Sequence, residues 1–288
     1  LERQIMGRLK LFIENFVVYG IGGVISKIIP LIMLPIVTRL MPNTEYFGLN
    51  DISVVIVSFG TAIAVMGMYD AMYRMFFEKD EQEYKEEICS STLGFTLVTS
   101  IIVFLVLIIF RPFFSKLFFG SGRYSNLLLL TALSILIGGT NSIVSAPTRM
   151  QNQRKVFLLT NTLSPILSYG VSIPLLLKGY YIIALPLASV ISALSMEIIF
   201  LILNRQWFSL KKIKRTYIKE MLYIALPLFP GFLIYWIFNA CDRLMIANMI
   251  GNDQVGIYAI GAKIGQVSQL IYTAFAGGWQ FFSFSTMK

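Results

Sequence analysis

Long apolar runs, separated by short polar segments, follow one another along most of the chain. Each run reaches or approaches the roughly 20 residues that an α-helix needs to cross the hydrocarbon of a bilayer. The pattern predicts spans at about residues 16–38, 48–69, 90–110, 127–147, 157–177, 181–203, 221–246 and 254–281. We therefore expect an all-α fold, a polytopic transmembrane helical bundle with about eight spans.

The composition is that of a membrane protein. Of the 288 residues, 56% are hydrophobic and 14% are charged, whereas soluble globular chains carry about a quarter charged residues. The formal net charge of +9 would suggest a nucleic-acid partner for a soluble protein. In a membrane protein, basic residues collect in cytoplasmic loops instead, so we expect no nucleic-acid partner.

The lysines and arginines outside the spans are unevenly divided between the two sides of the predicted bundle. With the N-terminus inside, the cytoplasmic segments hold Arg3, Arg8, Lys10, Arg74, Lys79, Lys85, Arg149, Arg154, Lys155, Arg205, Lys211, Lys212, Lys214, Arg215, Lys219 and Lys288. The outer side holds Arg39, Arg111, Lys116, Arg123, Lys178 and Arg243. Because the basic excess marks the cytoplasmic side, we expect a multi-pass protein of the cytoplasmic (cell) membrane with its N-terminus inside.

Residues for metal or acid–base chemistry are scarce. The chain has no histidine and two cysteines, Cys89 and Cys241. This excludes histidine-ligated metals, zinc clusters and histidine general-base catalysis. The glycines of "YGIGG" lie inside a span with no strand before them, so they are no nucleotide loop. We expect no metal, no cofactor and no catalytic residues, and hence not an enzyme.

Two stretches that are far apart in the sequence read alike. The first predicted helix ends in "RLMPNTEYFGLND" and the seventh in "ANMIGNDQVGIYAI". In both, an apolar run stops at a turn signal, a polar or acidic residue starts the next helix, and a glycine follows, Gly48 or Gly256. The helices before these turns carry paired prolines, namely Pro30 and Pro35, then Pro227 and Pro230.

This self-similarity predicts two lobes. Six spans lie between the two starts, and copies separated by an even number of spans keep the same orientation. Such copies are parallel repeats about an axis along the membrane normal. Residues 1–210 would form a first six-helix lobe, and residues 211–288 the first two helices of a second, incomplete lobe.

Several charged residues lie inside predicted spans, where each costs about 2.5–3.5 kcal/mol on insertion scales. They are Lys27, Asp51, Glu197, Asp242, Arg243 and Lys263, and Asn239 is a polar neighbour. Most of them belong to the first, second, seventh and eighth spans, the opening pair of each proposed lobe. Simpler interpretations stay open: a surface position for Asp51 and Glu197, and a local ion pair for Asp242 with Arg243.

The deep cations predict an anion site. Lys27, Lys263 and Arg243, turned into a shared cavity of low dielectric, would attract phosphate strongly, and arginine can bind it through two hydrogen bonds. Asp242, Asp51 and Asn239 would support these cations. The prolines Pro30, Pro35, Pro227 and Pro230 would act as hinges, because each removes a backbone hydrogen bond and bends its helix.

The same stretches resemble a known family. "SKIIPLIMLPIVTRLMPNTEYFGLND" is similar to the opening of the bacterial polysaccharide flippases, the exporters of O-antigen and capsule repeat units. "NACDRLMIANMIGNDQVGIYAIGAKIGQ" is similar to their second motif, and "AGGWQFFSFSTMK" to the end of their eighth helix. The chain departs from the pattern in the extra Phe47 of "EYFG" and in length, since members usually have about twelve to fourteen helices in two lobes.

The resemblance implies membership of the multidrug, oligosaccharidyl-lipid and polysaccharide exporter superfamily. Such a protein would move an undecaprenyl-pyrophosphate-linked oligosaccharide across the cytoplasmic membrane by alternating access, for surface polysaccharide biosynthesis. The pyrophosphate would lie against Lys27, Lys263 and Arg243, with Asp242 orienting Arg243. The implied partners are this polyprenyl-pyrophosphate oligosaccharide, the lipid bilayer, and the polysaccharide polymerase or export machinery.

Other functions stay open on the sequence alone. A cation-coupled multidrug antiporter of the same superfamily would need a midplane carboxylate, for which Asp51 and Asp242 are the candidates. A membrane-embedded polysaccharide-biosynthesis enzyme is disfavoured by the lack of histidine, of an acidic metal-binding pair and of a large outer loop. A truncated chain could also serve as a scaffold that does not transport. The excess of deep cations over deep acids favours an anionic substrate.

Overall fold

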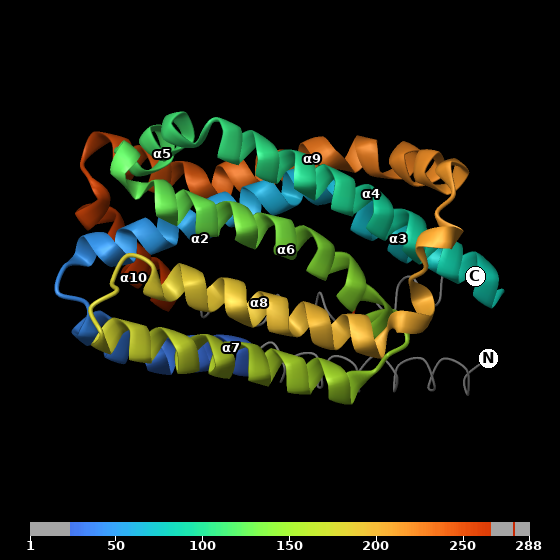
Figure 1. Cartoon of the computed structure of the whole chain (residues 1–288), viewed down its shortest axis with the longest axis horizontal. Coiled ribbons are helices and arrows are strands. Elements are labelled where there is room, and N and C mark those ends of the chain that lie inside the picture. Colours follow the sequence, from blue (N-terminus) through green and yellow to red (C-terminus); the bar gives the residue numbers. More distant parts are fainter. Residues whose placement is uncertain (1–23, 266–278, 280–288) are drawn as a thin grey trace.

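The computed structural model describes residues 24–265 and Trp279, which form a bundle of long helices (Figure 1). The long helices are residues 24–40, α2 (Thr44–Val65), α4 (Gln82–Ile109), α6 (Ser125–Met150), α7 (Arg154–Leu177), α8 (Ala184–Leu203), α9 (Arg215–Met249) and α10 (Asn252–Gly265). Shorter elements are α3 (Met68–Phe76), α5 (Arg111–Phe119) and the 3-10 turns η1 (Gly122–Tyr124), η2 (Arg205–Trp207) and η3 (Leu210–Lys212). The described residues contain no strand, which confirms the all-α prediction.

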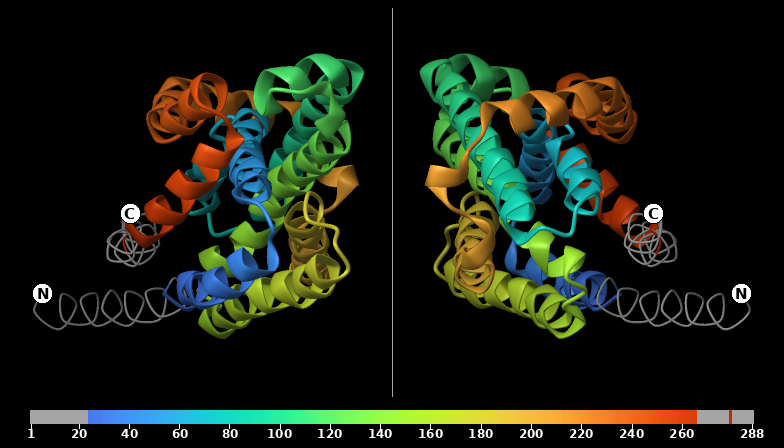
Figure 2. Two further views of the ribbon diagram at one scale, coloured as in Figure 1. Left: turned by 90° about the vertical axis from the view of Figure 1, so that its left-hand side faces the viewer. Right: turned by 90° about the vertical axis from the view of Figure 1, so that its right-hand side faces the viewer.

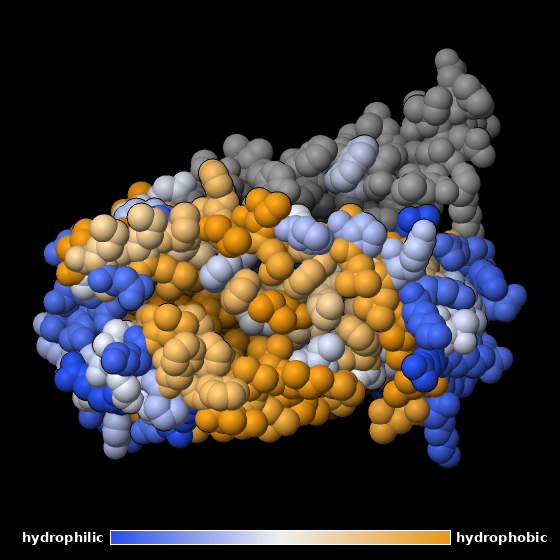
Figure 3. All heavy atoms as spheres, turned by 90° about the horizontal axis from the view of Figure 1, so that it is seen from above, coloured by the Kyte–Doolittle hydropathy of each residue, from blue (hydrophilic) through white to orange (hydrophobic). Residues whose placement is uncertain are grey.

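Each predicted span coincides with one of the long helices. Within the described residues, six helices are long and apolar enough to cross a membrane: α2, α4, α6 with its preceding turn, α7, α8 and the first part of α9. The predicted spans 16–38 and 254–281 lie partly outside the described residues, and helix is present where they are described. Figure 3 shows a hydrophobic band between two hydrophilic ends. The chain is therefore a multi-pass membrane protein.

Two element boundaries differ from the prediction. The predicted span 48–69 is interrupted, because Met66 and Gly67 adopt left-handed φ angles of 51° and 75°. These two residues end α2 and turn the chain into the separate helix α3. In contrast, α9 is longer than the predicted span 221–246 and runs through both of its prolines, as membrane helices tolerate.

Helix α6 is the centre of the packing, in contact with α2, α4 and α8. Helix α7 packs chiefly on α8. Residues 24–40 lie beside α7, as the views of Figures 1 and 2 both show. Helix α10 packs on α2. We call the end of the bundle where α2 and α10 begin the α2–α10 end; the charge distribution predicts that it is the outer one.

Among the described residues, the apolar core forms four clusters. One is built around Leu49, Leu127 and Val255 and includes residues of α2, α6 and α10. Another is built around Met72 and Ile88 and includes residues of α3, α4 and α9. Helix α7 has few buried side chains, namely Thr160, Ser172 and Leu176. This loosely packed side of the bundle borders the cavity described below.

The segment between α8 and α9 is fastened to α4. The Ser90 and Ser91 hydroxyls each accept a hydrogen bond of 2.9 Å, from the backbone N–H of Ser209 and Lys214 respectively. The ammonium of Lys214 also lies 2.5 Å from the carboxylate of Glu87, which is 8% exposed. The start of α9 is therefore held in place by paired backbone and side-chain contacts.

Asn204 joins the end of α8 to α6 and offers a test of the fold. Its fully buried amide donates to the Val144 carbonyl at 2.8 Å and to the Thr148 hydroxyl at 3.0 Å. Because losing a buried hydrogen-bond partner costs about 1–3 kcal/mol, Asn204→Ala should lower the free energy of unfolding by that amount in mixed-micelle denaturation. Asn248→Ala, whose exposed amide bonds only within its own helix, should change it by less than about 0.5 kcal/mol. Equal losses in the two variants would contradict this account.

Candidate functional site

A cavity of about 510 Å³ lies between residues 24–40 and helices α2, α6, α7, α8 and α10. Its polar lining consists of Ser26, Asn50, Asn141, Ser145, Thr148, Thr160, Asn161, Ser164, Ser168, Tyr169, Ser189 and Ser192. Two cations, Arg149 and Lys263, also line it, and none of the described lining residues is acidic. The cavity therefore offers hydroxyls and amides together with positive charge, which suits a polar ligand that carries anionic groups.

The wall supplied by α7 follows from helical periodicity. Phe157, Thr160, Asn161, Ser164 and Ser168 line the cavity, and their spacing of three or four residues places them on one face of the helix. The Ser192 hydroxyl of α8 donates to the Ser164 carbonyl at 2.8 Å, which joins the two walls. The sequence interpretation missed this face, although polar residues at helical spacing in an apolar span were a readable signal.

Lys263 is the predicted cation that the structure places in the cavity. It lies on α10, and its ammonium is 4.4 Å from the centroid of the Phe47 ring. Phe47, the residue that departs from the flippase pattern, is itself buried and lines the cavity. An aromatic face therefore covers the ammonium of Lys263.

Arg243 lies beside this site and does not line the cavity. Its Nε donates to Asp51 Oδ2 at 2.8 Å, and the two side chains are 11% and 10% exposed. A second contact joins Arg243 to its neighbour Asp242 at 3.4 Å, and the Tyr258 hydroxyl of α10 donates to Asp242. Asp51 is buried, so the interpretation of Asp51 as a surface residue is wrong. The ion pair links α2 to α9, and the hydrogen bond from Tyr258 to Asp242 links α10 to α9.

The remaining predicted residues are dispersed. Lys27 is partly exposed and does not line the cavity, whereas its neighbours Ser26 and Pro30 do. Pro35 is exposed, and so are Pro227 and Pro230 within α9. Glu197 is half-buried on α8, outside the cavity lining. The side chain of Asn239 lies outside the described part of the structure. The anion-site and hinge roles of these residues stay predictions.

The two stretches that read alike in the sequence contact each other. Gly48 of α2 and Gly256 of α10, which are 208 positions apart, meet where the two helices cross. A Cβ atom on Gly48 would lie 2.9 Å from the Gly256 nitrogen, and one on Gly256 would come too close to the Thr44 carbonyl oxygen. Only glycine allows such a close backbone approach. The starts of α2 and α10 therefore pack directly on each other, and the two-lobe organisation stays a prediction.

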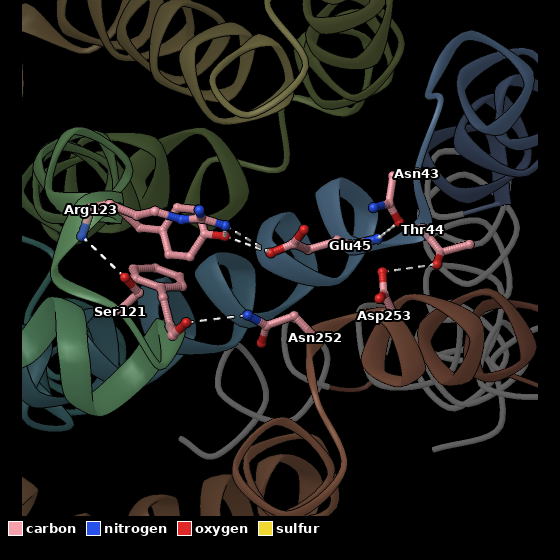
Figure 4. A network of polar contacts seen from close by, with 9 residues as sticks. Asn43, Thr44, Glu45, Ser121, Arg123, Asn252 and Asp253 are labelled. Carbon is pink, nitrogen blue, oxygen red and sulfur yellow. Dashed lines mark hydrogen bonds and ion pairs between the residues drawn. The ribbon is translucent and has the colours of Figure 1, made fainter.

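Polar contacts surround this crossing at the α2–α10 end (Figure 4). The Thr44 hydroxyl donates to Asp253 at 3.3 Å, and the Asn252 amide donates to the Phe119 carbonyl at 3.2 Å. Glu45 lies 3.7 Å from Arg123 and also accepts a hydrogen bond from Tyr124. These contacts join α10 to α2 and to the α5–α6 connection.

Comparison with known families decides the identity. Residues 36–285 match the profile of a family described as polysaccharide biosynthesis protein. The chain belongs to this polysaccharide biosynthesis family. The membership confirms the resemblance drawn from the motifs around Lys27, Arg243 and Lys263. Comparison with curated proteins gives no match.

Solved structures show which fold this member of the polysaccharide biosynthesis family has. The MATE multidrug transporter DinF-BH matches with a TM-score of 0.75 at 15% identity, over 96% of this chain and 66% of that one. A MATE protein in complex with Br-NRF matches with a TM-score of 0.66 at 16% identity over the same shares. An inward-facing multidrug resistance MATE transporter matches with a TM-score of 0.63 at 14% identity, over 94% and 63%. The fold is that of MATE transporters, and the chain spans about two thirds of their length.

Proposed function

We propose that the protein transports a lipid-linked oligosaccharide that carries a pyrophosphate, of the polyprenyl-pyrophosphate type, across the cell membrane for polysaccharide biosynthesis. The observation that carries this proposal is the lining of the cavity, which combines asparagine amides and serine and threonine hydroxyls with Lys263 and Arg149 and has no described acidic side chain. Family membership supports the assignment to polysaccharide export.

Each part of such a substrate has a complement in the lining. Amides and hydroxyls can donate to and accept from sugar hydroxyls, as on α7 and α8. Lys263 would hold a phosphate in surroundings of low dielectric, where one pair of unit charges about 4 Å apart interacts by about 4 kcal/mol at an effective dielectric constant of 20. Lys27 does not line the cavity in the present structure, and in this proposal it would approach the phosphate only in another state of the transport cycle. Arg243 is engaged by Asp51 in the present structure, so it would join only after that pair separates.

The orientation and the route belong to the same proposal. The N-terminus would face the cytoplasm, and the substrate would leave at the α2–α10 end. In the present structure this end is joined by the Gly48–Gly256 crossing and by the contact of Thr44 with Asp253. Transport by alternating access would require this contact to open and close in each cycle.

A cation-coupled multidrug antiporter is the second candidate, favoured by the MATE fold. A cationic drug in the cavity would need a carboxylate within reach. The lining residues described here include none, and Asp51 and Asp242 are both in contact with Arg243. The charges of the cavity therefore favour the lipid-linked anion over the drug cation.

Reconstitution of the full-length protein into liposomes tests the proposal. Two substrates would be compared, a fluorescent polyprenyl-pyrophosphate oligosaccharide and a cationic dye, each scored by its transfer between leaflets or into the lumen. Transfer of the oligosaccharide lipid at least tenfold above protein-free vesicles, with no transfer of the dye, is the expected result. Transfer of the dye alone would establish the antiporter instead.

A further inference from the structure

Asp51 lies on a stretch of α2 that borders the cavity on one side and contacts α9 on the other. The preceding residue, Asn50, lines the cavity, and so does Phe47 one turn earlier. The Asp51 side chain itself is nearly buried and accepts the 2.8 Å hydrogen bond from Arg243. The same short stretch of α2 thus presents one polar residue to the cavity and the next to α9.

Two cations lie on either side of this stretch of α2. Arg243 pairs with Asp51 itself, and Lys263 lines the cavity with its ammonium 4.4 Å from the ring centroid of Phe47, one turn before Asp51. Arg243 also contacts Asp242, which accepts a hydrogen bond from Tyr258. The charged and hydroxyl groups that face Asp51 therefore come from both α9 and α10, and the network crosses from α2 to both helices.

We propose that Asp51 couples anion binding in the cavity to the opening of the α2–α10 end. This inference rests on the proposed function, because it needs an anionic ligand at Lys263. A phosphate that reaches Lys263, which lies against Phe47 one turn before Asp51, places negative charge near the Asp51 carboxylate. The repulsion between the phosphate and the Asp51 carboxylate weakens the ion pair of Asp51 with Arg243, since like charges in a partly buried site interact strongly. Helix α2 can then separate from α9 and α10.

Asp51 is thus a positioning residue that acts through Lys263 and Arg243. A ligand shifts a conformational equilibrium only by its different affinity for the two states. In the closed state an anion bound at Lys263 would lie near the negative charge of Asp51, and in the open state it would lie farther from that charge. The open state therefore binds the anion more tightly, so anion binding favours opening.

A spin-label distance measurement tests this coupling. In the full-length protein with Cys89→Ser and Cys241→Ser, labels would be placed at Lys116 of α5 and Gln254 of α10, both exposed, and inorganic pyrophosphate would be titrated in. We expect the short-distance population of the parent protein to fall at least twofold at saturation. Asp51→Asn should show the long distance without pyrophosphate and a flat titration. A closed Asp51→Asn protein that titrates like its parent would overturn the proposal.

Two further variants separate coupling from simple structural support. Lys263→Gln keeps the Asp51–Arg243 pair, so the label distance without pyrophosphate should stay short. The response of that distance to pyrophosphate should disappear. If Asp51→Asn does not fold, Lys263→Gln alone tests the coupling. Asp253→Asn removes another carboxylate of the α2–α10 contact, away from Lys263, and its titration midpoint should stay within twofold of the parent. Loss of the response in Asp253→Asn, or its persistence in Lys263→Gln, would contradict the coupling.

The coupling and the proposed function fail in different experiments. If pyrophosphate opens the α2–α10 end while the reconstituted protein does not transfer the oligosaccharide lipid, the coupling stands and the proposed substrate is wrong. If the lipid is transferred while pyrophosphate leaves the distance unchanged, the substrate stands and the coupling is wrong.

Discussion

Gly256→Ala is expected to keep the α2–α10 end from closing and to lower transport by the full-length protein at least tenfold. The added Cβ would meet the carbonyl oxygen and carbon of Thr44, which belong to the backbone and cannot rotate away. Overpacking of this kind costs about 1–3 kcal/mol, and each 1.4 kcal/mol is a factor of ten in the closed population. The liposome transfer assay and the label distance between α5 and α10 would both record the change.

A matched control exists on the same helix. Gly261 is exposed, and no atom of the described residues lies within 4 Å of an added Cβ, so Gly261→Ala should transport at the parental rate and show the parental distance. The contact is symmetrical, because a Cβ on Gly48 would meet the Asn252 carbonyl, and Gly48→Ala should therefore reproduce the defect of Gly256→Ala. Parental transport and distance in both Gly256→Ala and Gly48→Ala would show that the crossing is unimportant.

Lys263→Gln is expected to abolish surface polysaccharide in cells that depend on the full-length protein. Lys263 is the predicted cation that lines the cavity, and glutamine keeps much of its length without the charge. Losing about 4 kcal/mol of attraction to phosphate corresponds to roughly a thousandfold in affinity, although solvent in the cavity will reduce this. Surface polysaccharide would be measured by gel analysis, and the amount of protein in the membrane by immunoblot.

Lys178→Gln is the matched control for this variant. Lys178 follows α7 and is exposed, so the same loss of charge there should leave surface polysaccharide unchanged. Normal polysaccharide in cells with Lys263→Gln, at equal protein levels, would show that this lysine does not hold the substrate.

The fold was largely predictable because apolar run length is a strong signal in membrane proteins. Every predicted span except 48–69 corresponds to a single helix where the structure describes it, and α4, α6, α7 and α8 differ from their predicted limits by a few residues at most ends. The break at Met66 and Gly67 was missed, because hydropathy continues across it. Such turns depend on backbone conformation and not on hydrophobicity.

The candidate site was predictable only in part. Charge inside a span identified Lys263, Asp51 and Arg243, but sequence gives no rotation of one helix against another. It could not show that Arg243 pairs with Asp51 across 192 positions while Lys263 faces the cavity. The hydroxyl and amide face of α7 was missed because a single serine or asparagine costs little free energy in a span, so none of these residues was singled out. The similarity of Gly48 and Gly256 was seen, and their direct contact was not foreseeable without the structure.

The central claim is that the cavity recognises a saccharide and a phosphate together, and a comparison of two ligands tests it most directly. Binding to the purified full-length protein would be measured for a polyprenyl-pyrophosphate oligosaccharide and for the same polyprenyl oligosaccharide joined without phosphate. We predict that the pyrophosphate form binds at least tenfold more tightly, and that Lys263→Gln removes this preference while leaving the affinity for the neutral form within about twofold. Equal affinities for the two ligands in the parent protein would contradict the account.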